Sequence, residues 1–439
     1  MNVVVAGTGY VGLVTGVCLA DLGHTVTCVD TDEHKIEIMQ AGQSPIYEDG
    51  LSELMAKNKS RLHYTTDYQS AYKDAEVIFI GVGTPEKKDG SANLKYVLEV
   101  SKQIAECVQQ DCIIVMKSTV PIGTNDRVEA IMEENLTHPV HIEIASNPEF
   151  LSQGTAVYDT QHATRIVLGV KSEKAEAVLR KLYSTANIPM IVTDRVSAEM
   201  IKYASNDFLA LKISYINEIA NFCEIVGANI EDVALGMGMD ARIGNRFLKA
   251  GIGYGGSCFP KDTKALHWLA NYHDYELKTV KAAIEINESQ KYKLIKKAWK
   301  YVDNFKGLTI AVLGLTFKPD TDDLREAPSL KNIPIFLDDG ATVRVWDPIG
   351  FPNFQKIYPN EVTYCRTIEE TITEADLCFI FTEWYDIIKF DINKYSQLMK
   401  NPIILDGRNC YRIKDFENAQ VIYESIGRQT INHLTIDNK

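Results

Sequence analysis

The stretch GYGGSCFPKD, residues 253–262, places a cysteine inside a glycine-rich turn, close to a lysine and an aspartate. Glycines accept positive φ angles and let a backbone approach a ligand closely. A cysteine on such a turn, with a cation and an acid within reach, has the environment of a nucleophile. Cys258, Lys261 and Asp262 are therefore candidate catalytic residues. The alternative is that Cys258 is a small buried hydrophobic residue, as most cysteines are.

A second chemical signal opens the chain. Residues 2–30, NVVVAGTGYVGLVTGVCLADLGHTVTCVD, predict a strand, a glycine turn, a helix and a second strand. The turn is GxGxxG, in which Gly7 makes the tight bend, Gly9 admits a pyrophosphate and Gly12 lets the helix pack on the strand. The helix N-terminus attracts the anion. This pattern predicts dinucleotide binding, against the alternative of a glycine-rich structural turn.

The acid that closes the second strand indicates which dinucleotide binds. Asp30 follows Gly12 by 18 residues and is placed to accept hydrogen bonds from the adenosine ribose. It favours NAD over NADP, because a carboxylate repels a 2′-phosphate. Lys35 complicates this preference slightly, although one lysine can serve a neighbouring phosphate.

Composition bounds the class of protein. The 439 residues suggest about three domains, and 45% of them are hydrophobic, which is enough for ordinary cores. A net charge of -13 argues against a nucleic-acid surface. The start MNVVVAG enters a strand at once, so we expect no export leader, no membrane segment and a cytoplasmic location. Nine widely spaced cysteines without a CxxC pair favour reduced thiols and no metal site.

The last third of the chain repeats the first in outline. Three segments have counterparts in the first third: 308–315 matches the first strand, 340–347 matches 23–30, and 375–384 matches 75–84. Segment 402–409 falls where CIIVMKST does. The apolar runs at 75–85 and 112–124 end in small residues, as strands lining a cofactor would. We therefore expect an α/β fold with two Rossmann-like doubly wound parallel-sheet domains, 1–195 and 301–439, joined by a central helical domain, 196–300.

The segment between the two sheets carries a long helical pattern, with apolar residues at three- and four-residue spacing. These residues are Met200, Ala204, Phe208, Leu211 and Tyr215.

The second copy differs from the first at its first turn. It carries TFKPDTDDLRE in place of GxGxxG, so Lys318 and Arg325 stand where glycines stood. Two halves with different anion chemistry suggest two different nucleotides, namely NAD and a nucleotide-linked substrate. Surface lysines in a loop are the plainer alternative.

Eight motifs in order carry a resemblance that spans the chain: GTGYVGL, PIYEDGL, STVPIGT, NPEFL, KYASN, GYGGSCFPKD, GLTFKPDTDDLREAPS and DGRN. Together they resemble the UDP-glucose/GDP-mannose dehydrogenase family. Members that oxidise UDP-N-acetylmannosamine usually carry a histidine beside the nucleophile, whereas Ser257 precedes Cys258 here. The sequence is therefore more similar to the branch that acts on UDP-glucose.

The resemblance implies an NAD-dependent four-electron oxidation of UDP-glucose to UDP-glucuronate, by a homodimer or higher homo-oligomer. Cys258 would capture the intermediate aldehyde as a thiohemiacetal, which a second oxidation turns into a thioester. A near alternative is the same chemistry on a UDP-amino sugar. Other classes are a β-hydroxyacid dehydrogenase, which needs no cysteine nucleophile or third domain, and a nucleotide sensor without turnover.

Site residues carry over from the family motifs by position. Catalytic roles are implied for Cys258, Lys202, Asn206, Asp262, Thr119 and Glu149. Residues expected at the cofactor are Gly7, Gly9, Tyr10, Val11, Gly12, Asp30, Lys35, Thr84, Thr119, Gln153, Lys261 and Arg325. Residues expected at the substrate are Glu149, Phe150, Leu151, Gln153, Lys202, Asn206, Arg242, Phe247, Leu248, Lys249, Ala250, Gly251, Tyr254, Gly255, Phe317, Lys318 and Arg408. Arg242 corresponds to an arginine that reaches the neighbouring subunit's site.

Two positions depart from the family pattern. Gln153 stands where a carboxylate is expected, so it can orient a ligand but cannot act as a general base. Asp207 follows Asn206 where a small residue is common. The sequence gives no consequence for this second change.

Overall fold

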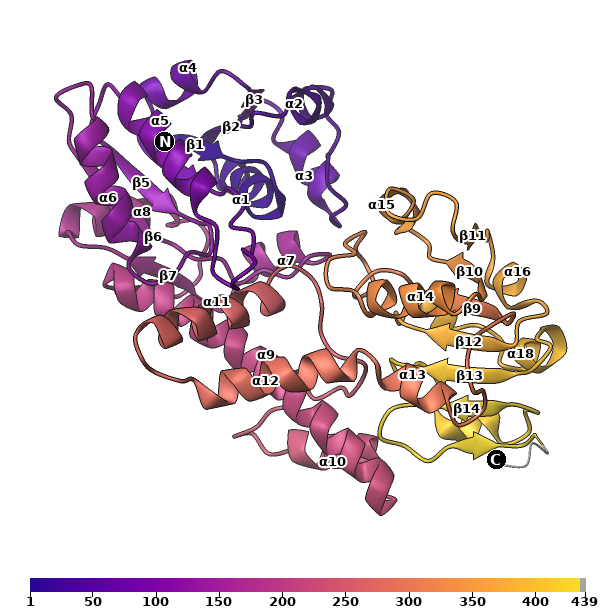
Figure 1. The fold of residues 1–439 in the computed structure, drawn as a ribbon. Helices are drawn as coiled ribbons and strands as arrows, with labels where there is room; N and C mark the ends of the chain where they lie inside the picture. The colour runs from indigo at the N-terminus through magenta and orange to yellow at the C-terminus, as the bar shows by residue number, and fades with distance from the viewer. Residues whose placement is uncertain (435–439) are drawn as a thin grey trace. The chain divides into compact units, whose positions relative to one another are not determined.

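The computed structural model describes residues 1–434. Contacts within the chain divide it into two compact units, whose elements are labelled in Figure 1. The first unit comprises residues 1–205 and 268–274. The second comprises residues 206–267 and 275 onward.

The first unit is built on an eight-stranded sheet, with the order β3-β2-β1-β4-β5-β6-β7-β8. The β6–β7 pair is antiparallel and the other neighbours are parallel, so the expectation of a parallel sheet holds for all but one pair. The strands are β1 Asn2–Ala6, β2 Thr25–Val29, β3 Leu62–Thr65, β4 Val77–Ile80, β5 Cys112–Met116, β6 Ile142–Ser146, β7 Ile166–Gly169 and β8 Met190–Thr193.

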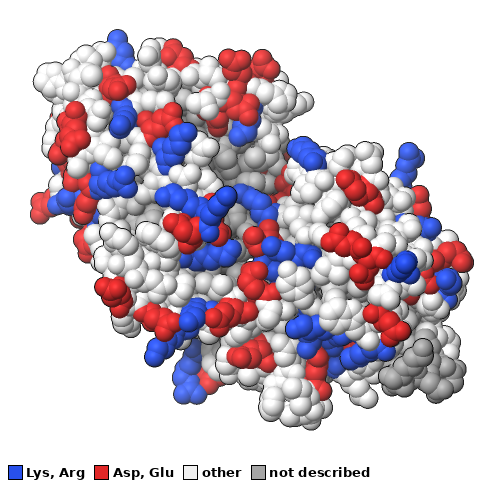
Figure 2. All heavy atoms as spheres, in the orientation of Figure 1, with Lys and Arg blue, Asp and Glu red and all other residues white. Residues whose placement is uncertain are grey.

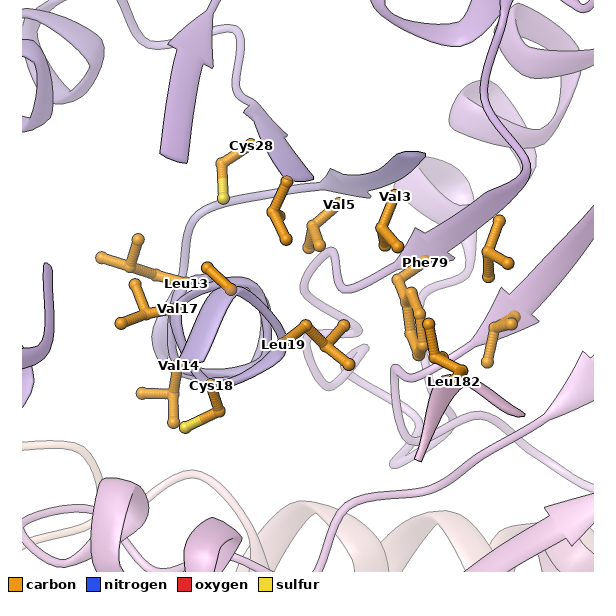
Figure 3. Packing of buried hydrophobic residues seen from close by; sticks show 14 of the residues in the cluster. Val3, Val5, Leu13, Val14, Val17, Cys18, Leu19, Cys28, Phe79 and Leu182 are labelled. Atoms are coloured by element: carbon orange, nitrogen blue, oxygen red, sulfur yellow. The ribbon is translucent and has the colours of Figure 1, made fainter. Parts of the chain in front are cut away.

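The first unit's helices cover this sheet. They are α1 Tyr10–Asp21, α2 Glu33–Gln40, α3 Leu51–Lys57, α4 Tyr68–Lys73, α5 Lys95–Cys107, α6 Thr124–Asn135, α7 Ala156–Gln161 and α8 Glu173–Leu182. Figure 3 shows α1 beside β1, with Leu19 on the side of the helix toward Val3 and Val5 and with Leu13 toward Cys28 of β2. Nine consecutive residues of α1 are buried. This burial fixes the position of the glycine turn that precedes the helix.

The second unit repeats the strand order of the first. Its seven-stranded sheet runs β11-β10-β9-β12-β13-β14-β15, so β11-β10-β9-β12-β13 corresponds to β3-β2-β1-β4-β5. The repeat expected from the sequence is confirmed, with one antiparallel pair, β14–β15, at the far edge. The strands are β9 Thr309–Leu313, β10 Thr342–Trp346, β11 Thr363–Tyr364, β12 Leu377–Ile380, β13 Ile403–Asp406, β14 Ile422–Glu424 and β15 Ile431–Asn432.

Helices of the second unit pack on its sheet or extend from it. They include α10 Ile230–Gly238, α12 Lys278–Gln290, α13 Lys293–Ala298, α14 Pro328–Asp338, α15 Phe351–Phe354, α16 Ile368–Ile372, α17 Tyr385–Ile388, α18 Asn393–Leu398 and the 3₁₀ turn Ile413–Phe416. Buried aromatic side chains, including Phe305, Phe336 and Phe379, fill the core between α14 and the strands.

Two helices include residues of both units. They are α9, the 32-residue helix Arg195–Val226, and α11 Phe259–Tyr272. The predicted long helix is therefore present. Its apolar series is not core, because Met200, Phe208 and Tyr215 are 43%, 62% and 46% exposed.

Charged side chains of both signs are interspersed on the face shown in Figure 2. Within residues 1–434 no helix is both long enough and apolar enough to cross a membrane. All nine cysteines are present as thiols.

Candidate active site

The first glycine turn is held by close backbone packing. Gly7 has a φ of 95°, and a Cβ atom there would lie 3.0 Å from the carbonyl oxygen of Gly81. A Cβ atom on Gly12 would lie 2.0 Å from the carbonyl oxygen of Gly7. At Gly9, by contrast, a Cβ atom would meet nothing within 4 Å. Of the three glycines, only Gly9 therefore borders open space. A residue that a pyrophosphate approaches needs such space.

The acid at the end of β2 is tied to this turn. Asp30 Oδ2 accepts hydrogen bonds from the backbone N–H (2.8 Å) and hydroxyl (2.5 Å) of Thr8. Its Oδ1 accepts one from Asp32 N–H, at 3.1 Å. Burial acts to raise the pKa of Asp30, but these hydrogen bonds and the charge of Lys35 lower it below its usual value. Asp30 is thus an ionised acceptor beside the glycine turn, in the place where the ribose of a dinucleotide is expected.

Other expected cofactor residues lie on the same edge of this sheet or on the helix after the turn. Tyr10 and Val11 are the first residues of α1, directly after Gly9. The Thr84 hydroxyl donates to the carbonyl oxygen of Thr119 at 2.8 Å, which joins the segments after β4 and β5. The turn, the open Gly9 and the ionised Asp30 fit NAD.

A buried ion pair forms where α9 meets the segment after β6. Lys202 Nζ lies 2.8 Å from Glu149 Oε1, and both side chains are about 95% buried. Glu149 Oε2 also accepts a hydrogen bond from Leu151 N–H at 2.7 Å. Lys117 lies in the same charge cluster and donates to Asn147 Oδ1 at 3.0 Å. Desolvation lowers the pKa of Lys117 to about 8, with Lys202 adding to the effect and Glu149 opposing it.

The segment after Glu149 is stabilised by contacts on both sides. The guanidinium of Arg165 lies 3.9 Å from the centre of the Phe150 ring, and Lys202 Nζ lies 5.4 Å from it. Gln153 is buried, at 8% exposure. Glu48, in the motif PIYEDGL, accepts hydrogen bonds from the N–H groups of residues 154 and 156 at 2.8 and 2.6 Å. Glu48 is a supporting residue that the sequence analysis did not assign.

In the second unit, the candidate nucleophile lies directly before a helix. Cys258 immediately precedes α11, and its carbonyl oxygen accepts the helical hydrogen bond from Asp262 N–H at 2.8 Å. Its side chain is half-buried, and Sγ lies 3.8 Å from the Ser257 hydroxyl. The positive end of a helix dipole stabilises a thiolate. This position suits a nucleophile better than the core of a sheet does.

The glycines around Cys258 have a different use from the one expected. A Cβ atom on Gly255 would lie 2.6 Å from the carbonyl oxygen of Glu326, and one on Gly256 would lie 2.8 Å from the Phe317 ring. Gly253 and Gly256 do adopt positive φ angles, 90° and 78°. At Gly255 and Gly256 the absence of a side chain therefore allows the turn to pack tightly against Glu326 and Phe317.

Three side chains near Cys258 form a buried polar chain. Asn206 Nδ2 donates to Asp262 Oδ2 at 2.7 Å, and Lys261 Nζ pairs with Asp262 Oδ1 at 2.5 Å. Asp262 is 1% exposed and Asn206 is 6% exposed. As expected, Lys202 and Asn206 lie one helical turn apart on α9. Asp262 is thus a buried carboxylate with two donors, four residues from the thiol.

The segment before Cys258 lies beside the first turn of the second sheet. Arg408 donates to the carbonyl oxygens of Phe381, Gly253 and Phe317, at 2.8, 3.0 and 3.1 Å. These contacts tie β12, the cysteine turn and the turn after β9 together. The Phe247 ring contacts that of Phe259, with the centroids 6.2 Å apart. A cavity of about 360 Å³ lies alongside and is lined by Ile230, Glu231, Ala234, Leu235, Asn245, Leu248, Lys249, Ala250 and Asn409.

The remaining basic residues of the second unit are more exposed. Arg325 is 58% exposed at its side chain and makes a bidentate contact with Asp323. Lys318 Nζ lies 5.7 Å from the centre of the Phe317 ring. Arg242 is 89% exposed at its side chain and is paired with the neighbouring Asp240 at 2.6 Å.

Comparison with known proteins agrees with this arrangement. Three models of the UDP-glucose/GDP-mannose dehydrogenase family match the chain, with the NAD binding domain at residues 1–187, the central domain at 196–289 and the UDP binding domain at 311–413. The chain belongs to the UDP-glucose/GDP-mannose dehydrogenase family. The glycine turn and strands β1 to β7 of its first sheet lie in that family's NAD binding domain.

Relatives in the family match over nearly their whole length. The chain is 51% identical to UDP-glucose 6-dehydrogenase YwqF of Bacillus subtilis, over 98% of each chain. A solved UDP-glucose dehydrogenase from Pyrobaculum islandicum superposes with a TM-score of 0.91 at 34% identity, over 97% of this chain and 98% of that one. A UDP-D-ManNAc dehydrogenase from Pyrococcus horikoshii gives 0.86 at 26% identity, over 98% and 99%.

Several supporting residues escaped the sequence analysis because they are neither charged pairs nor glycines. Asn287 accepts a hydrogen bond from Tyr254 N–H at 2.8 Å and donates to its carbonyl oxygen at 3.1 Å. Asn217 accepts from Gly251 N–H, and Gln290 donates to the Gly251 carbonyl oxygen. The sequence pattern that could have predicted Asn217, Asn287 and Gln290 is an Asn or Gln on the buried face of a helix, where it can bond the backbone of a glycine-rich loop.

Proposed function

We propose that this chain oxidises UDP-glucose to UDP-glucuronate with NAD, through a covalent intermediate on Cys258. The observation that carries the proposal is the position of Cys258 at the start of α11, beside a buried Asp262 that is held by Asn206 and Lys261. The chain also has the dinucleotide turn that such an oxidation needs. Family membership over nearly the whole chain supports the same activity.

The covalent step accounts for the cysteine. Oxidation of a primary alcohol to a carboxylate removes four electrons and passes through an aldehyde. NAD, when bound, supplies the acceptor for one hydride at each of the two oxidation levels. Cys258 adds through sulfur to the aldehyde carbon and gives a thiohemiacetal, which becomes a thioester when the second hydride leaves. Water then replaces sulfur at that carbon, releasing the acid and the thiol.

The polar residues receive roles that suit their contacts. Lys202, a cation kept desolvated beside Glu149, stabilises negative charge on the substrate oxygen, since low dielectric strengthens such an interaction. Glu149 accepts or returns the proton of that oxygen. Asn206 holds the sugar oxygens and orients Asp262. Asp262 and Thr119 position the hydrolytic water.

Binding roles are divided between the two nucleotides. We assign Gly9, Asp30 and the residues grouped with them in the sequence analysis to NAD, with Lys261 and Arg325 on the NAD side. UDP is assigned to Lys318, Phe317, Arg408 and the backbone of 249–255. Arg408 is already bonded to three carbonyl oxygens, so its contribution includes shaping the segment that holds UDP.

A UDP-amino sugar is the second candidate substrate. The solved UDP-D-ManNAc dehydrogenase from Pyrococcus horikoshii has nearly the same fold, with a TM-score of 0.86. Ser257 beside Cys258 favours glucose, because the amino-sugar branch usually has a histidine at that place.

The activity is tested by counting NADH formed per UDP-glucose consumed, with UDP-glucuronate identified as product. A ratio of two supports the double oxidation, and parallel assays with UDP-N-acetylmannosamine separate the two substrates. A ratio of one would contradict the four-electron reaction, as would oxidation of the amino sugar alone.

We further propose that the chain works as a homodimer in the cytoplasm. An apolar stripe of α9, comprising Val196, Met200, Phe208, Tyr215 and Phe222, is 43–62% exposed and suits a helix of a second copy. Arg242 is exposed enough to reach a neighbouring site. The nine reduced cysteines support a reducing compartment.

The dimer can be tested by complementation. Mixing inactive Arg242→Ala and Cys258→Ala subunits restores part of the activity if Arg242 acts in its neighbour's site, since one hybrid site then has both native residues. No recovery in mixed dimers that have been shown to form would leave Arg242 acting within its own chain.

A further inference from the structure

Asp207 is a buried carboxyl group that the roles assigned above do not use. It follows Asn206 on α9 and is 5% exposed. Neither of its carboxyl oxygens has a hydrogen-bond partner. An ionised carboxylate in this place would lose its hydration without any compensating contact, whereas a neutral carboxylic acid loses far less.

The neighbouring polar residues on the buried side of α9 behave differently. Asn206, Ser214 and Asn217 make hydrogen bonds of 2.7, 2.7 and 2.8 Å to α11, α12 and the segment before Cys258. On this side of the helix each of these three side chains makes at least one hydrogen bond to a neighbouring segment, although Asn217 Nδ2 has no partner. Asp207 lies on the same side of the helix, but its carboxyl group makes no hydrogen bond to a neighbouring segment.

The charged groups around Asp207 come from three elements. Asp262, with its partner Lys261, belongs to α11, Tyr254 to the segment before Cys258, and Glu288, whose charge acts on Tyr254, to α12. Burial, followed by the negative charge of Asp262, raises the pKa of Asp207 to about 8. Tyr254 is affected in turn, because burial and then the charges of Asp207 and Glu288 raise its pKa above the usual range.

Hydrogen bonding decides which carboxyl of the pair carries the negative charge. Asp262 accepts from Asn206 at 2.7 Å and from Lys261 at 2.5 Å, and both donors favour its ionised form. Asp207 accepts from neither. A negative charge is therefore compensated by donors at Asp262 and by none at Asp207, where the proton stays bound.

We propose that Asp207 is a positioning residue of the reaction, which stores the proton of an Asp207–Asp262 pair and so keeps Asp262 anionic and bound to Asn206 and Lys261. The inference rests on the role proposed for Asp262 in thioester hydrolysis. When Asp207 loses its proton, a second negative charge enters the same buried region, and its repulsion disrupts the contacts of Asp262. Turnover then falls as pH rises through the ionisation of Asp207.

The test compares the ratio of turnover at pH 7 to turnover at pH 9 in three proteins. We expect a ratio of about ten for the unaltered protein, as for one ionisation centred near pH 8. Asp207→Asn, which cannot ionise, should give a ratio below about two. Glu288→Gln, which removes a nearby carboxylate but leaves Asp207, should behave like the unaltered protein. An Asp207→Asn ratio equal to that of the unaltered protein overturns the inference.

A spectroscopic measurement makes the test independent of turnover. The infrared spectrum of the unaltered protein at pH 6 should contain a carboxylic-acid C=O band that disappears with a midpoint near pH 8. Asp207→Asn should lack this band, and its absence from the unaltered protein overturns the inference. If the band behaves as expected but UDP-glucose is not oxidised, the proposed function fails and the protonated state of Asp207 stands.

The stability of Asp207→Asn should also depend on pH in a defined direction. The folded chain keeps a proton on Asp207 that the unfolded chain releases above about pH 4, so native stability falls as pH rises from about 4 to 8. Asp207→Asn cannot ionise, so its stability does not fall for this reason between about pH 4 and 8. Its advantage in melting temperature over the unaltered protein should therefore be larger at pH 8 than at pH 5, and an equal or reversed difference contradicts a buried neutral Asp207.

Discussion

The first strand of each sheet is followed by a glycine with a positive φ angle, and the second strand by an aspartate. Gly7 and Gly314 adopt φ angles of 95° and 85°, and each donates its N–H at 2.8 Å to the last residue of the neighbouring strand. The acids that follow are Asp30 and Asp347. The backbone frame is therefore the same in both halves.

The two acids differ in how much of their bonding capacity the protein uses. Asp347 is 3% exposed and accepts five hydrogen bonds, from the N–H groups of residues 315, 316, 349 and 350 and from the indole of Trp384. Asp30 is half-buried and accepts from Thr8 and Asp32 alone among the described residues. One position in a repeated fold is thus an internal anchor in one copy, and in the other it keeps bonding capacity for the ligand role that we propose.

The turns themselves diverge in the same way. In the first copy a Cβ atom on Gly9 would meet nothing within 4 Å, so the turn leaves room for a ligand. In the second copy the turn continues into Phe317, whose ring packs against Gly256 of the cysteine turn. The second turn thus packs against the segment that carries Cys258, whereas the first turn leaves Gly9 uncovered.

The largest effect expected from this comparison is on folding. Asp347→Ala leaves five buried donors without an acceptor and should lower the free energy of unfolding by about 3–5 kcal/mol. Asp30→Ala removes fewer and more accessible contacts and should cost about 1–2 kcal/mol. Melting curves followed by circular dichroism measure both, and equal losses would show that the two acids are equivalent anchors.

A pair of glycine substitutions sharpens the difference between packing and ligand approach. Gly12→Ala places a Cβ atom 2.0 Å from a carbonyl oxygen and should destabilise the fold by about 1–3 kcal/mol. Gly9 has a φ of -73°, which alanine adopts readily, so Gly9→Ala should fold normally. It should nevertheless bind NAD about tenfold more weakly, or about 1.4 kcal/mol, by calorimetric titration. Unchanged NAD affinity in Gly9→Ala would exclude this turn as the pyrophosphate site.

The smallest effect concerns the choice of cofactor. Asp30→Ala should raise the KM for NAD by about tenfold and reduce the preference over NADP, because a ribose acceptor and a repulsive charge are both lost. Steady-state rates with each cofactor measure the preference. Equal use of NAD and NADP by the unaltered protein would contradict the role of Asp30.

Local pattern predicted much of this molecule. The first turn could be inferred because Gly7, Gly12 and Asp30 have fixed mechanical tasks within about 25 residues, and the structure confirms the turn. The second sheet could be inferred because GATVRVWD repeats GHTVTCVD at the corresponding place. The motifs of the family then indicated the oxidation and the cofactor.

The rest depends on contacts between distant segments. The hydrogen bonds of Glu48 to residues 154 and 156 join segments more than 100 positions apart, so no local spacing predicts them. The tight packing of Gly255 and Gly256 on Phe317 and Glu326 likewise appears only when the second sheet is folded. The state of Asp207 depends on burial and on Asp262, 55 positions away, which a helical pattern does not reveal.

The account turns on a thioester between Cys258 and the substrate, so the most direct test is to trap it. Asp262→Asn should leave the thiol able to capture the aldehyde while slowing the water step. After incubation with UDP-glucose and NAD, intact-protein mass spectrometry should show a UDP-glucuronyl adduct, located on Cys258 by peptide mapping. Cys258→Ala should show no adduct and no UDP-glucuronate. Production of UDP-glucuronate by Cys258→Ala at the unaltered rate would contradict the covalent role of Cys258.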